Sequence, residues 1–222
     1  MGARLSGCSS VSFSRRAADQ IPHEVGERLQ PLLRLIATLS EEIKAYDQRI
    51  EKLASEKYMH TKLLRQVTGV GPVTALAYVL TVETPLRFKR SRDVGPYLGL
   101  VPQQEDSGDS QPQLGISKAG DRMLRKLLVG SAHSILGPFG PDTDLRRFGM
   151  KLCPRGGKNA KKRASVAVAR KLAVLLHRLW SSGEVYEPPG PRNAKDDNPT
   201  SRCVDEKHKW FCSLQDDLLI EG

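Results

Sequence analysis

The chain has 222 residues, of which 39% are hydrophobic, and a net charge of +10 at pH 7. This length allows one large domain or two small ones, with enough apolar residues for a core. No apolar run approaches the roughly 18 residues of a membrane span, so we predict no membrane partner. The four cysteines form no C-x-x-C pair, which predicts neither a zinc site nor a disulfide framework and favours a location in the reducing cytosol.

The first 60 residues divide into a leader and a long helix. Residues 1–21 are rich in Ser, Arg, Gly and Ala without a clear apolar stripe, which predicts a flexible leader. Residues 22–60 are predicted to be a coiled-coil helix, with Pro22 and Pro31 limiting its extension towards the N-terminus. Its apolar positions alternate in steps of three and four, which is a heptad seam: Leu29, Leu32, Ile36, Leu39, Ile43, Tyr46, Ile50 and Leu53. The seam is expected to meet a second copy or another segment of the same polypeptide, or to pack on its own domain.

Two glycines interrupt the next apolar stretch, LLRQVTGVGPVTALAYVLTV, over residues 63–82. Gly69 and Gly71 separate two helical segments, and Pro72 suits the first turn of the second. This pattern is typical of a helix-hairpin-helix, in which glycines and helix amides approach a phosphate. A plain turn between two helices is the alternative.

The remainder of the chain also has mainly helical patterns. Amphipathic or strongly helical segments are predicted over residues 121–133, 144–150 and 164–180, with strand signals few and short. Residues 188–222 are mixed and weakly periodic, which predicts a flexible tail. The fold class expected is therefore mainly α, with a long coiled-coil helix followed by a compact helical domain, residues 61–187.

Positive charge is concentrated between residues 145 and 183, where eleven Lys and Arg occur with no Asp or Glu. Clustered cations attract phosphates, and binding releases counterions. This asymmetry favours a polyanion partner, although a solvated charged face would give the same composition.

Few residues suggest a metal site or an acyl-transfer site. Glu105, Asp106 and Asp109 are close in sequence but belong to one loop, whereas a metal nuclease needs carboxylates converging from rigid elements. His133 and His177 lie on apolar helical segments, where structural histidines are the commoner case. We therefore expect no metal site in this chain.

Ser107 raises a different possibility, attack of its hydroxyl on a phosphodiester. Such a nucleophile needs activation, and the phosphate oxygens need positive charge nearby. Lys118, Arg122 and Arg125 follow it, and the two arginines share a helix face at three-residue spacing. From these residues alone, an ordinary loop serine is the favoured interpretation.

Four segments in order resemble a known family. They are LLRQVTGVGPVTALAYV, GPYLGLVPQQEDSG, LGISKAGDRMLRKLL and KNAKKRASVAVARKLAVLLHRLWSSGEVY. Together they are similar to the C-terminal transposase domain of the insertion-sequence 110/116/902 family, over about residues 63–187. The heptad helix resembles the coiled coil that precedes this domain in the family.

The resemblance implies a recombinase, guided by a structured bridge RNA, whose serine joins covalently to DNA. That serine corresponds to Ser107. A second motif corresponds to Ile116, Ser117, Lys118, Gly120, Asp121, Leu124 and Arg125, which are expected to shape the loop and contact the nucleic-acid backbone. RNA pairing would then supply sequence choice. The residues predicted to bind nucleic acid are Gly69, Gly71, Thr74, Lys118, Arg122, Arg125, Lys158, Lys161, Lys162 and Arg163.

Two departures from the family pattern shape the expected function. Family members carry an RNase H-like (RuvC-like) domain that binds Mg²⁺, and no such domain is recognisable before the heptad helix. Glu105 and Asp106 stand where relatives often have basic residues, and they would repel a phosphate. We therefore predict a truncated transposase of the prokaryotic cytoplasm and nucleoid that is not competent alone. Its predicted partners are DNA, guide RNA, and a second copy or a RuvC-like domain in trans. The alternatives are a non-enzymatic nucleic-acid-binding module and a coiled-coil interaction protein.

Overall fold

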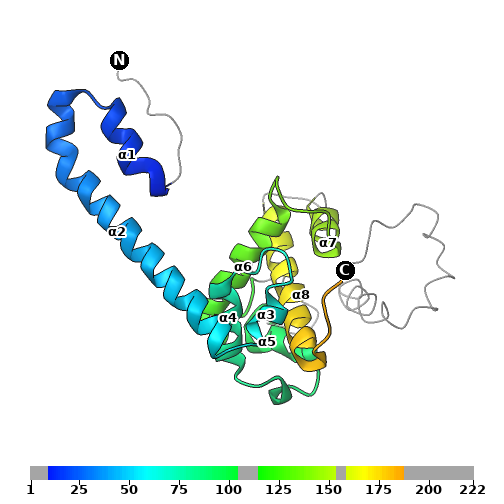
Figure 1. Ribbon diagram of the computed structural model, residues 1–222. Coiled ribbons are helices and arrows are strands. Elements are labelled where there is room, and N and C mark those ends of the chain that lie inside the picture. The colour runs from blue at the N-terminus through cyan, green and yellow to red at the C-terminus, as the bar shows by residue number, and fades with distance from the viewer. Residues whose placement is uncertain (1–9, 105–114, 154–158, 188–222) are drawn as a thin grey trace.

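The computed structural model describes residues 10–104, 115–153 and 159–187, and the elements within them are helical. The prediction of a mainly α fold is confirmed. Figure 1 shows a long helix projecting from a compact helical body. The helices are α1 (Ser10–Gln20), α2 (His23–Glu56), α3 (Thr61–Leu64), α4 (Pro72–Val82), α5 (Val94–Tyr97), α6 (Arg122–Leu136), α7 (Asp144–Leu152) and α8 (Ala160–Ser182), with two 3-10 turns, η1 (Pro85–Arg87) and η2 (Ser91–Asp93).

Helix α8 forms the centre of the body. Its sequence is apolar around most of its circumference, a pattern typical of a buried helix, and α3, α5, α6 and α7 all contact it. Small residues allow close approach: a Cβ on Gly149 of α7 would lie 2.6 Å from Val168 and 2.5 Å from Leu136. Helix α5 precedes residues 99–120 and α6 follows them, and both helices pack on α8, so the two ends of this segment are held by the same core.

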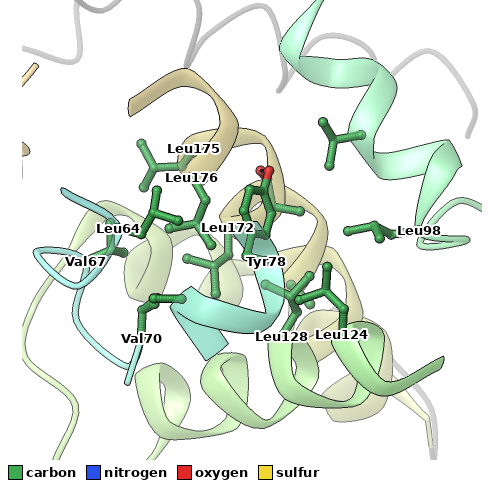
Figure 2. Close-up of a cluster of buried hydrophobic side chains, with 14 of the residues drawn as sticks. Leu64, Val67, Val70, Tyr78, Leu98, Leu124, Leu128, Leu172, Leu175 and Leu176 are labelled. Carbon is green, nitrogen blue, oxygen red and sulfur yellow. Dashed lines mark hydrogen bonds between the residues drawn. The ribbon is translucent and has the colours of Figure 1, made fainter. Parts of the chain in front are cut away.

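Tyr78 of α4 occupies the middle of this core, among leucines of α6 and α8 (Figure 2). Its side chain is fully buried, and its hydroxyl donates a hydrogen bond of 2.7 Å to the carbonyl of Ala173 in α8. Burial raises the pKa of the phenol, so the hydroxyl remains a donor throughout the ordinary pH range. The bond fixes α4 against the central helix.

His177 of α8 holds the segment that carries the two 3-10 turns. Its Nε2 lies 2.9 Å from the carbonyl oxygen of Pro85, and its Nδ1 lies 3.0 Å from the hydroxyl of Ser91. Because a carbonyl only accepts, Nε2 carries the proton and Nδ1 accepts from Ser91. The expectation of a structural role for this histidine is confirmed. His133, by contrast, is exposed on α6.

Helix α2 occupies most of the range predicted for the long helix, residues 22–60, and ends at Glu56. It starts at His23 and continues through Pro31, although proline removes one helical hydrogen bond. Helix α1 packs along its N-terminal part, where Ala17 and Leu33 are buried. Within the predicted flexible leader, residues 1–21, the described residues 10–20 are therefore helical, and residues 1–9 lie outside the described residues.

The heptad seam of α2 faces solvent. Large apolar side chains that are 37–62% exposed follow one another along the helix: Val25, Leu32, Leu35, Leu39, Ile43, Tyr46 and Leu53. We call this set the α2 stripe. The C-terminal end of α2 packs against the helical body. Ala54 is buried there, and its carbonyl accepts a 3.0 Å hydrogen bond from the hydroxyl of Thr61.

The buried environment of His177 predicts a pH-dependent stability. Burial lowers the pKa of the imidazole below its ordinary value of 6.5, so the unfolded chain binds the proton more readily, and the free energy of unfolding decreases as the pH falls below about 6.5. We expect urea unfolding at pH 7.5 and 5.0 to show a smaller decrease for His177→Gln than for the parent chain. Equal decreases in the two proteins would contradict the assignment.

Candidate nucleic-acid interface

Two short segments on either side of residues 105–114 pair with each other. Residues 99–104 run antiparallel to residues 115–120, and Pro102 forms a β-bridge with Ile116. Backbone hydrogen bonds join Gln103 to Gly115 (2.8 Å), Ser117 to Val101 (2.9 Å) and Lys118 to Gly99 (3.2 Å). We call this paired structure the stem. It brings the two ends of the intervening stretch close together.

The stem requires glycine at both of its outer ends. Gly99 and Gly120 have φ angles of +64° and +68°, in the left-handed region. A Cβ on Gly99 would lie 2.2 Å from the amide nitrogen of Ala119, and one on Gly120 would lie 2.0 Å from the carbonyl oxygen of Tyr97. Because these neighbours are backbone atoms, they cannot turn aside as a side chain would. Glycine therefore allows the two strands and α5 to come this close.

Side chains of α6 fasten the stem to the core. Asp121 caps the helix, accepting a 2.5 Å hydrogen bond from the amide of Leu124, whose side chain is fully buried. One amino group of Arg125, Nη1, donates to the carbonyl of Leu98 at 3.0 Å and to that of Ala119 at 2.6 Å. The motif that resembles the family thus has a structural role in this chain, and part of the Arg125 guanidinium is occupied by it.

Two cations remain exposed where the stem meets α6. Lys118 has a φ of +56°, which is uncommon for a residue with a side chain, and it is exposed, as is Arg122 in the first turn of the helix. Arg122 and Arg125 are three residues apart, so they lie on one helix face. Lys118, Arg122 and Arg125 together form what we call the α6 basic group.

A second basic group stands at the start of α8. Lys161, Lys162 and Arg163 are exposed in the first turn, which contains no acidic residue, and the side chain of Asn159 makes no capping hydrogen bond. The amide groups and the helix dipole already favour anions at this end of a helix. The three cations, which we call the α8 basic group, therefore add to a field that attracts phosphate.

Other cations of the basic region stabilise the fold. Nη1 of Arg146 donates to the carbonyls of Ile135 (2.7 Å) and Gly137. The guanidinium of Arg147 pairs with Asp142 at 2.8 Å and with Asp144, which raises the pKa of Arg147. Lys171 is buried, with its ammonium 3.5 Å from the centroid of the Phe148 ring. The charge excess seen in the sequence therefore overstates the cations available to a ligand.

The residues of the predicted helix-hairpin-helix differ in their surroundings. Helix α3 has only four residues, and a Cβ on Gly69 would lie 3.0 Å from the carbonyl oxygen of Ser131, so this glycine permits contact with α6. Thr74 is buried, which directs its side chain away from a surface ligand. Gly71 precedes α4, and no atom lies within 4 Å of a Cβ built on it. Of the three predicted hairpin residues, Gly71 keeps open space beside the helix N-terminus.

Two predicted site residues, Ser107 and Lys158, lie outside the described residues, as do Glu105 and Asp106. Within the part of the chain that the structure describes, no group of three or more His, Cys, Asp or Glu side chains could hold a metal ion. No helix of that same part is long and apolar enough to cross a membrane.

Comparison with known proteins points to transposases. Residues 61–144 match the model of the family described as Transposase IS116/IS110/IS902. The chain is 35% identical over 147 residues to a transposase for insertion sequence element IS1111A of Coxiella burnetii, an alignment covering 66% of this chain and 39% of the relative.

Two further relatives have similar coverage. The chain is 32% identical to a probable family 20 transposase of Pseudomonas aeruginosa, over 71% of this chain and 48% of the relative. It is 34% identical to a putative transposase of Sinorhizobium fredii, over 65% of this chain and 37% of the relative. The chain thus spans less than half the length of these relatives. The family-model match over residues 61–144 includes the stem and α6.

The stem geometry predicts the effect of a single methyl group. Gly120→Ala should lower the free energy of unfolding by about 1–3 kcal/mol, because the alanine would need a left-handed backbone and would clash with the Tyr97 carbonyl. Gly115→Ala is the matched control, since a Cβ there meets no atom within 4 Å, and its effect should stay within about 0.5 kcal/mol. Urea unfolding measures both. A Gly120→Ala chain as stable as the control would argue against the stem.

Proposed function

We propose that this chain is part of a DNA transposase of the insertion-sequence 110/116/902 type and that its helical body binds nucleic acid. The observation that carries the proposal is the family-model match over residues 61–144, a region that ends in the stem, α6 and the start of α7. The activity of a whole transposase is proposed from the names of relatives that are more than twice as long as the matched segment. The setting is the prokaryotic nucleoid, where DNA is present.

The two basic groups supply the proposed contacts. Exposed lysine and arginine near helix N-termini bind phosphate without regard to base sequence. We assign Lys118 and Arg122 to one set of backbone contacts, and Lys161 and Lys162 to another. Sequence choice would come from a structured guide RNA that pairs with DNA, as the family resemblance implies.

Ser107 is the proposed nucleophile, on the basis of the family resemblance. Its hydroxyl oxygen would attack a DNA phosphorus, forming a phosphoserine ester and displacing a sugar hydroxyl, with the serine proton passing to a base. The family resemblance implies that a separate acidic domain holds Mg²⁺. Among the described residues, no group of three or more His, Cys, Asp or Glu side chains could hold the ion. The contribution proposed for this chain is therefore binding, positioning and the nucleophile.

Salt dependence tests the binding proposal. The logarithm of the association constant for duplex DNA should fall linearly with the logarithm of salt concentration, with a slope reduced by about 0.9 for each phosphate contact removed. Lys161→Gln combined with Lys162→Gln should lower the slope, whereas Lys44→Gln combined with Lys52→Gln, the same charge change on exposed positions of α2, should not. A slope that does not differ between the two variants would contradict the assignment to α8.

The same assay separates binding from chemistry. Ser107→Ala should keep both the affinity for DNA and the salt-dependence slope, because the proposed role of Ser107 is nucleophilic attack and an uncharged serine makes no ionic contact with phosphate. Covalent protein–DNA adducts, sought with bridge RNA, a nicked duplex and a longer relative added in trans, should form only with the parent serine. Adducts that persist in Ser107→Ala would assign the nucleophile elsewhere, and their absence from every mixture would refute the catalytic role.

A second candidate function is assembly through α2, favoured by the exposure of the α2 stripe. Six of its residues lie along one face at heptad positions or beside them, and Ile43 is 62% exposed. Apolar side chains at this spacing bury one another when two helices pair, so a second copy of the chain would cover them.

Sedimentation tests the assembly. We expect the parent to sediment as a dimer and Leu39→Lys combined with Ile43→Lys to sediment as a monomer, because burying two ammonium groups in an apolar seam is costly. Gln30→Lys combined with Gln48→Lys adds the same charge away from the stripe and should leave the dimer intact. A parent chain that sediments as a monomer would contradict assembly through the α2 stripe.

A further inference from the structure

The guanidinium of Arg125 is only half used by the fold. It offers five N–H donors, and the two on Nη1 are directed at the carbonyls of Leu98 and Ala119. Its other edge, formed by Nε and Nη2, makes no hydrogen bond to any residue that the structure describes. The side chain is partly exposed, so this edge is open to a ligand from solution.

The two carbonyls lie at the outer ends of the stem strands. Leu98 directly precedes the strand that begins at Gly99, and Ala119 directly precedes Gly120 at the end of the other. By donating to both, one amino group of α6 holds the two strands side by side. If Arg125 moved away, the three backbone hydrogen bonds of the stem would lose the side chain that bridges its two segments.

The open edge belongs to the α6 basic group. Arg122 is one helical turn away on the same face, and Lys118 stands at the end of the stem. A parallel pair of N–H groups such as Nε and Nη2 matches two oxygens of a phosphate, and such bidentate contacts are geometrically specific. A phosphate bound there would restrict the side chain whose other amino group closes the stem.

We propose that Arg125 couples DNA binding to closure of the stem, with Nη1 holding the Leu98 and Ala119 carbonyls while the Nε–Nη2 edge binds a backbone phosphate. The inference rests on the proposed nucleic-acid binding and adds to it a positioning residue. Binding and closure then favour one another reciprocally, because each reduces the freedom that the other must remove. DNA contact would thereby fix the spacing between residues 104 and 115.

Amide hydrogen exchange, measured by NMR, reads the stem directly. The reporters are the amides of Gln103, Ser117 and Lys118, which donate the three stem hydrogen bonds. Without DNA, Arg125→Gln should accelerate their exchange by roughly tenfold or more, while Arg122→Gln, a matched loss of charge one turn away, should leave it unchanged. With saturating duplex DNA, exchange should slow in the parent and in Arg122→Gln but not in Arg125→Gln.

Salt dependence supplies the second measurement. Arg122→Gln and Arg125→Gln should each reduce the slope of the logarithm of the DNA association constant against the logarithm of salt concentration by about 0.9, because each removes one phosphate contact. Arg125→Lys should keep most of the slope, because the charge remains, yet exchange as fast as Arg125→Gln, because an ammonium lacks the planar fork that serves the stem and a phosphate together. Circular dichroism and a cooperative urea transition verify that each variant is folded.

Two failures are distinguishable. A parent chain that does not bind duplex DNA would overturn the proposed function and this inference with it. A parent chain that binds DNA with a clear salt slope, while DNA slows stem exchange equally in Arg125→Gln and Arg122→Gln, would overturn the inference alone.

Discussion

The burial of α8 is the constraint on which the rest of the structure depends. The surrounding helices cover most of its length, and two polar side chains fix their positions: Tyr78 bonds α4 to the Ala173 carbonyl, and His177 secures the segment through Pro85 and Ser91. These contacts allow few adjustments, because a buried donor or acceptor that loses its partner incurs the full cost of desolvation. The rigidity of α8 therefore extends to α5 and α6, on which the stem is mounted.

Positive charge serves two purposes in this chain, and the contacts of each cation distinguish them. Arg146 and Arg147 bind carbonyls and carboxylates within the fold, and Lys171 is covered by an aromatic ring. Lys118, Arg122, Lys161 and Lys162 are instead exposed at or near helix starts, where the helix dipole repels positive charge. Placement of like charge there weakens the isolated helix and strengthens attraction for an anion, a combination that suits a nucleic-acid surface better than a purely structural one.

Sequence patterns predicted helices α4, α6, α7 and α8, because α6 and α7 have an apolar periodicity, α4 and α8 have long apolar runs, and ends such as Pro72 and Asp121 are recognisable. They did not predict α1, which packs against α2. The family resemblance placed Arg125 among the residues that shape the loop, but its contacts could not be predicted, since a side chain that reaches carbonyls 6 and 27 residues away leaves no periodic signal. The helix-hairpin-helix stays a prediction, and local sequence did not reveal that Gly69 lies against α6.

Photo-cross-linking tests the central claim, that DNA lies against the starts of α6 and α8. Benzoylphenylalanine would replace Met123, which is 57% exposed beside Arg122, or Asn159, which precedes the α8 basic group. The same substitution at Tyr46, also 57% exposed but on the α2 stripe, provides the comparison. The account predicts salt-sensitive cross-links to duplex DNA from Met123→benzoylphenylalanine and Asn159→benzoylphenylalanine and few from position 46. Cross-links from position 46 alone would contradict it.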